Sequence, residues 1–74
     1  MQEKVMPGDE TIRQFQTGRV FIRTVDSRGW YICEPSGVFH LYKDGEIRSG
    51  ATDSRAFWET EEEATNFFKK WKQN

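Results

Sequence analysis

The stretch that decides the fold reads TEEEATNFFKKWKQ and runs from Thr60 to Gln73. Its apolar residues recur at helical spacing, which predicts an amphipathic helix with one buried stripe. That stripe consists of Ala64, Phe67, Phe68 and Trp71. Thr60 is a favourable N-cap residue, and Glu63 follows it at the spacing of a capping box. Because such a helix must be covered on its apolar side, we expect it to pack on a sheet.

The residues before this helix are rich in β-branched and aromatic side chains, which favour strands. We expect strands at residues 19–25, 30–34 and 38–43, with a short fourth strand around Ile47. The turns between them read Asp26-Ser27-Arg28-Gly29, Glu34-Pro35-Ser36-Gly37 and Asp44-Gly45. The last is expected to be a two-residue turn that sets Lys43 opposite Glu46. The sequence therefore predicts an α+β fold, with a three- to four-stranded antiparallel meander sheet packed against one C-terminal helix.

The part of the chain before the first strand allows two interpretations. Within residues 9–17, Ile12 and Phe15 lie three positions apart and Gly18 follows, which favours a short N-terminal helix. The alternative is a strand pair that turns at Thr17-Gly18. We prefer the helix.

Length and composition describe one small domain. The chain of 74 residues is expected to form a single domain over residues 9–74, after a flexible polar lead-in at residues 1–8. Its one cysteine, Cys33, excludes an internal disulfide and favours a reducing compartment. The sequence has no run of apolar residues long enough for a signal peptide or a membrane span, so we expect a cytoplasmic protein without membrane contact. Eleven basic and twelve acidic side chains give a net charge of −1, which disfavours tight nucleic-acid binding.

The register of the middle hairpin decides which side chains share a sheet face. A three-residue loop at residues 35–37 would pair Cys33 with Phe39 and Ile32 with His40. One face then carries Tyr31, Cys33, Phe39 and Leu41, and the other carries Trp30, Ile32, Glu34, Val38, His40 and Tyr42. We expect the helix to cover the first face, because that face carries no ionisable group other than the Cys33 thiol.

The second face is then an aromatic surface available to a partner. Its predicted contact residues are Trp30, Ile32, His40 and Tyr42, flanked by Arg23, Arg28 and Arg48. Aromatic rings and arginines are enriched at protein interfaces, so the sequence favours a non-enzymatic module that acts by protein–protein contact or by homodimerisation. The alternative function is weak binding of single-stranded nucleic acid, with Trp30 and Tyr42 as a stacking platform. A third possibility is an ordinary core, closed by residues 9–17 folding over this face.

No residue pattern in the sequence predicts an enzyme. Cys33 and His40 lie on adjacent strands but point to opposite faces in this register, and only a one-residue change of the loop would bring them together. A lone buried cysteine usually behaves as a small apolar residue. His40 has no partner at metal-ligand spacing, and no glycine-rich run precedes a helix. We therefore expect no catalytic residue, no metal and no cofactor.

Overall fold

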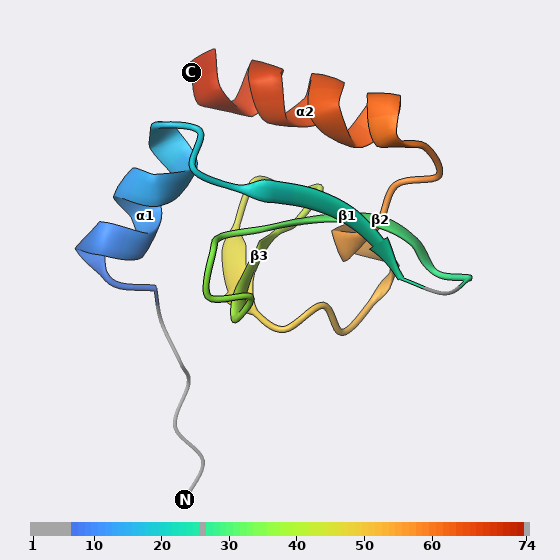
Figure 1. Ribbon diagram of the computed structural model, residues 1–74, viewed down its shortest axis with the longest axis horizontal. Helices are drawn as coiled ribbons and strands as arrows, with labels where there is room; N and C mark the ends of the chain where they lie inside the picture. Colours follow the sequence, from blue (N-terminus) through green and yellow to red (C-terminus); the bar gives the residue numbers. More distant parts are fainter. Residues whose placement is uncertain (1–6, 26, 74) are drawn as a thin grey trace, which may run out of the picture.

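The computed structural model describes residues 7–25 and 27–73 and has an α+β architecture (Figure 1). Four antiparallel strands form one sheet in the order β1-β2-β3-β4, so the sheet is a meander. The elements are α1 (Asp9–Gln16), β1 (Phe21–Val25), β2 (Gly29–Cys33), β3 (Phe39–Leu41), β4 (Ile47–Ser49), the 3-10 helix η1 (Ser54–Ala56) and α2 (Glu61–Gln73). The predicted fold class is confirmed, with four strands. The predicted lead-in, residues 1–8, lies outside the described residues except for Pro7 and Gly8.

Helix α2 lies across one face of the sheet and packs on β1 and β2 (Figure 1). It starts as predicted, because the backbone amide of Glu63 donates to the Thr60 hydroxyl at 3.1 Å. The side chains that contact the core are the predicted stripe of Ala64, Phe67, Phe68 and Trp71. Packing of this stripe, more than helix propensity, holds a helix of this length in place.

Helix α1 confirms the helical interpretation of the N-terminal part. Gly8 is its N-cap, and the helix ends before Gly18, whose φ of +86° is rarely adopted by other residues. Phe15 is fully buried and packs edge-on against Trp71, with ring centroids 6.2 Å apart. Helix α1 therefore completes the core on the α2 side of the sheet. It packs in the same core as Ile32, as the third possibility above expected, but it does not cover Tyr42, which that possibility placed on the same face.

The hairpin between β2 and β3 is one residue longer than predicted. Cys33 pairs with His40, where a three-residue loop would have paired it with Phe39. The carboxylate of Glu34 accepts hydrogen bonds from the amides of Ser36 at 2.9 Å, Val38 at 3.2 Å and Phe39 at 3.1 Å, and from the Ser36 hydroxyl. Because the Val38 amide donates to this side chain, Val38 does not pair with the Glu34 backbone and joins the loop.

The hairpin between β3 and β4 is also longer by one residue. The Tyr42 amide donates to the Glu46 carbonyl at 2.9 Å, so Tyr42, and not Lys43, lies opposite Glu46. Gly45 closes the loop with a φ of +88°, and its amide donates to the Tyr42 carbonyl at 2.9 Å. Its own carbonyl accepts from the Trp71 indole N–H at 3.1 Å, which ties this loop to α2. The predicted two-residue turn is therefore wrong.

The longer β2–β3 hairpin changes which residues lie beneath α2. The residues that pack there from the sheet are Val20, Ile22, Trp30, Ile32, Phe39, Leu41 and Ile47. Phe39 and Leu41 face α2 as predicted, but Trp30 and Ile32 join them in place of Tyr31 and Cys33. The predicted face assignment is wrong for β2, because a one-residue change of register moves a whole strand's side chains to the other face.

The segment after β4 returns across the other side of the sheet. Through η1 it places Ala56 and Phe57 against Tyr42 and Tyr31 in a second, smaller apolar cluster. Trp58 then forms an antiparallel bridge with Trp30, with N–O distances of 2.7 and 2.8 Å. The sequence indicated only a loop here, so this partial cover of the second face was not predicted.

Candidate interaction surface

We call the sheet face opposite α2 the outer face. Strand pairing assigns to it Phe21, Arg23, Val25, Tyr31, Cys33, His40 and Arg48. Val38 and Tyr42 flank β3 and follow the same alternation, because backbone hydrogen bonds to Gly50 and Glu46 continue the pairing with the β4 side. Within the described part of the chain, α1 and α2 both pack on the other side. Among residues 7–25 and 27–73, the segment that carries Ala56 and Phe57 covers the outer face at the end near Tyr42.

The open part of the outer face exposes apolar side chains. One row crosses all four strands, and its members are Phe21, Cys33, His40 and Arg48. Phe21 is 41% exposed, and Val38, two residues before His40, is 46% exposed. The guanidinium of Arg23 lies over the Phe21 ring, 4.4 Å from its centroid. The outer face therefore exposes an aromatic ring with a cation over it on β1, and a branched aliphatic side chain beside β3.

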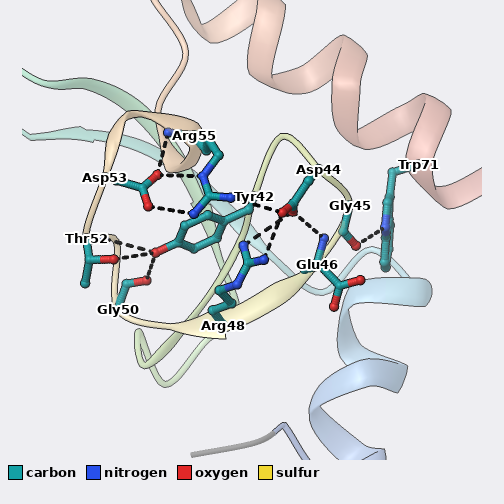
Figure 2. A network of polar contacts seen from close by, with 10 residues as sticks. All are labelled: Tyr42, Asp44, Gly45, Glu46, Arg48, Gly50, Thr52, Asp53, Arg55 and Trp71. Carbon is teal, nitrogen blue, oxygen red and sulfur yellow. Dashed lines mark hydrogen bonds and ion pairs between the residues drawn. The ribbon is translucent and has the colours of Figure 1, made fainter. Parts of the chain in front are cut away.

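At the covered end, Tyr42 is the centre of a polar network (Figure 2). Its hydroxyl donates to the Gly50 carbonyl at 2.8 Å and accepts from the Thr52 amide at 3.0 Å. Its ring lies between the guanidinium groups of Arg48 and Arg55, whose distances to the ring centroid are 4.7 and 5.8 Å. Tyr42 is only 1% exposed. It therefore holds the segment after β4 in place and has no ring face left for a partner.

Two carboxylates neutralise the arginines beside Tyr42 (Figure 2). Asp44 pairs with Arg48 at 2.8 Å and with Arg55 at 3.4 Å, and Asp53 pairs with Arg55 at 2.9 Å. The hydrogen bond from Arg55 lowers the pKa of Asp53 to about 2, and the one from Arg48 lowers the pKa of Asp44. Arg48 is thus committed to contacts within the chain, which leaves Arg23 as the arginine on this face most available to a partner.

The longer hairpin brings Cys33 and His40 onto the same face. Both are buried, at 3% and 8% exposure. Burial raises the pKa of the Cys33 thiol, with Arg23 opposing it, and burial lowers the pKa of His40. Both groups are therefore neutral near pH 7, the opposite of the thiolate–imidazolium pair that a nucleophilic cysteine needs. Among the described residues, no group of three or more His, Cys, Asp or Glu side chains is placed to hold a metal ion.

The residues predicted to form one contact site are divided between three places. His40, Tyr42, Arg23 and Arg48 lie on the outer face, Trp30 and Ile32 lie beneath α2, and Arg28 lies at the β1–β2 turn, with its guanidinium 5.2 Å from the centre of the Phe57 ring. The predicted stacking platform of Trp30 and Tyr42 is wrong, because the two rings are on opposite faces. Phe21 and Val38 are exposed on this face but were not among the predicted contact residues. The predicted register assigns Val38 to the face of His40 and Tyr42, and Phe21 follows from Arg23 by strand alternation.

A shallow hollow of about 410 Å³ opens beside the covered end, lined in part by Arg28, Lys43, Phe57 and Trp58. The ammonium group of Lys43 lies 5.7 Å from the centre of the Trp58 ring. Asp53 and Glu59 also line this hollow and balance the two cations. Its mixed charge gives no preference for an anionic or a cationic ligand.

Comparisons of the chain with protein-family models, with curated proteins and with solved structures return no match. Between residues 7 and 73, leaving out position 26, no helix has the length and apolar character needed to cross a membrane. Function therefore has to be inferred from the outer face.

Proposed function

We propose that this chain is a small non-enzymatic interaction module that binds another protein through its outer face. The observation that carries the proposal is the exposure of Phe21 and Val38, at 41% and 46%, on the face that α1 and α2 leave open. Aromatic residues and arginines are enriched at protein interfaces, and a contiguous exposed apolar patch marks a contact site more often than a random surface does.

The stack of Arg23 on Phe21 supports the same proposal. A guanidinium 4.4 Å from a ring centroid presents a flat apolar surface and five N–H donors side by side. Arginine is among the residues that carry much of the binding energy at interface centres, and phenylalanine is enriched at such centres. Cys33 and His40, which follow Phe21 in the same row, are buried, and the proposal gives them no catalytic role.

A reducing, cytoplasmic setting is part of this proposal. It is supported by the single cysteine, which is present as a buried free thiol. Self-association and nucleic-acid binding are the competing modes of contact. The net charge of −1 and the loss of Tyr42 as a stacking ring weigh against nucleic acid.

The test is an affinity capture from native lysate with the tagged chain, in nuclease-treated and untreated halves. The outer-face variant combines Phe21→Ser with Val38→Ser, and the control variant combines Glu62→Ser with Lys69→Ser on the exposed side of α2. We expect one protein to be captured by the wild type and by the control, with or without nuclease, and to be lost from the outer-face variant. Capture that survives in the outer-face variant, or that disappears with nuclease, contradicts the proposal. Sedimentation of the free chain tests self-association directly.

A further inference from the structure

Strand β1 ends the sheet, and its outer edge has no partner in the described chain. In the part of the chain that the structure describes, the strand order places β1 beside β2 alone, and the one bridge outside the named strands joins Trp30 to Trp58. Backbone N–H and C=O groups on an edge strand point alternately towards and away from the neighbouring strand. The outward groups of an edge strand form a template on which an extended segment of another chain can add a strand.

The sequence of β1 offers little of the protection that edge strands normally have. It reads FIRTV, with no proline and one charge, and every residue except Ile22 is exposed. Natural edge strands are usually protected by proline, by several charges, by a bulge or by a covering segment. The five residues pair with β2 without a break in register, from Phe21 opposite Cys33 to Val25 opposite Gly29. The edge is therefore regular over its five residues, four of which are exposed.

We infer that the edge of β1 binds an extended acidic segment of a partner protein, which adds to the sheet as a fifth strand. This inference rests on the proposed function and specifies its partner. Arg23 is the central residue of β1 and, among the described residues, pairs with no carboxylate. A carboxylate opposite Arg23 would form a favourable cross-strand pair. Phe21 and Val25, on the same face as Arg23, favour apolar side chains two residues to either side of that carboxylate.

The same charge argues against a second copy of this chain as the occupant. If two β1 strands pair antiparallel over all five residues, Arg23 of one copy lies directly opposite Arg23 of the other. Like charges in that position are destabilising. A shift by two residues relieves the repulsion but leaves only three residue pairs, too short a ladder to hold two small domains together.

The probe is a synthetic peptide in which Val-Thr-Glu-Thr-Val is flanked by serines and both ends are blocked. One matched control has Lys in place of Glu, and another carries N-methyl groups on alternate backbone amides, which prevents strand addition without changing charge. The isotope-labelled full chain is titrated with each peptide and followed by amide NMR. We expect the acidic peptide to bind with a Kd on the order of 1 mM and to shift the amides of β1 first. The methylated peptide should not bind.

A charge swap makes the test specific. The acidic peptide should bind about threefold to tenfold more tightly than the Lys peptide, and Arg23→Glu should reverse this preference. Lys69→Glu, an equal change of charge on the exposed side of α2, should leave the preference unchanged. The inference is overturned if no peptide binds, if Arg23→Glu does not alter the preference, if Lys69→Glu alters it equally, or if the free chain dimerises through β1.

The two proposals can fail separately. If the captured protein is lost with the outer-face variant but no peptide shifts the amides of β1, outer-face binding stands and strand addition at β1 is wrong. If the acidic peptide adds to β1 but no protein depends on Phe21 and Val38, the edge binds a segment and the outer face is not the contact surface.

Discussion

Cys33 lies directly opposite His40 across β2 and β3, and both side chains belong to the outer face. A cysteine and a histidine in this position could be taken for a catalytic pair. A catalytic pair needs a thiolate and an imidazolium, but burial here favours the neutral forms. It raises the pKa of the thiol and lowers the pKa of the imidazole, so neither group is charged near neutral pH. Both side chains are buried within the face.

This gives a first prediction on thiol reactivity. At pH 7.5, Cys33 of the folded chain should react with iodoacetamide much more slowly than in the urea-unfolded chain, because it is 3% exposed and its raised pKa disfavours the thiolate. Mass spectrometry of timed samples measures both rates. A folded-state rate equal to or above the unfolded rate would indicate an activated nucleophile and would contradict the non-enzymatic proposal.

A second prediction concerns pH and His40. Burial lowers the pKa of His40 from its ordinary value of 6.5, while the Val38 backbone and Glu34 oppose that change. Below pH 6.5 the unfolded chain therefore binds more protons at this position than the folded chain does, and folding stability falls as pH falls. Urea unfolding should show full stability at pH 7.5 and a decrease at pH 5.5. In His40→Gln this decrease should be smaller, and an unchanged decrease would contradict the assignment.

A third prediction tests the role of Glu34 in setting the register. Burial raises the pKa of its carboxyl, but the hydrogen bonds from Ser36, Phe39 and Val38 lower the pKa overall, so the folded chain favours the ionised form. Glu34→Ala leaves these donors without their acceptor and should lower the free energy of unfolding by roughly 1–3 kcal/mol. Glu34→Gln keeps one oxygen acceptor and should lose less. Equal stability of all three chains in urea would show that the carboxylate does not hold the loop.

A fourth prediction separates core residues from contact residues. Ile32 is fully buried beneath α2, so Ile32→Ala should lower the free energy of unfolding by about 2–5 kcal/mol. Phe21→Ser changes a side chain that is 41% exposed and should lower it by less than Ile32→Ala does. Capture of the partner is measured under conditions in which both variants are folded. It should be weakened more by Phe21→Ser than by Ile32→Ala. If Ile32→Ala abolishes capture while folded, the sequence-based contact site was correct after all.

The fold was accessible from the sequence because local signals agreed with one another. The cap at Thr60, the apolar stripe ending at Trp71 and the turns before each strand all describe the same meander with a helix across it. Periodicity of this kind depends on neighbours in sequence, so no tertiary information is needed to interpret it.

The contact site was less accessible, because it depends on register. The sequence suggested a three-residue loop after Glu34, in which Val38 would pair with Glu34. In the structure, the carboxylate of Glu34 instead accepts hydrogen bonds from the amides of Val38 and Phe39. A carboxylate that accepts hydrogen bonds from the amides of its own loop is a local side-chain effect that the turn pattern alone does not contain. Because the loop between β2 and β3 is one residue longer than predicted, Trp30 and Ile32 lie beneath α2 and Phe21 lies on the exposed face.

The most direct test of the central claim is site-specific photo-crosslinking from the outer face. A photoreactive phenylalanine analogue replaces Phe21 in one chain and Lys69, on the exposed side of α2, in another. Each chain is irradiated in native lysate after nuclease treatment, and adducts are identified by mass spectrometry. The account predicts one discrete protein adduct from position 21 and none from position 69. The absence of an adduct at position 21, or the same adduct from both positions, would contradict it.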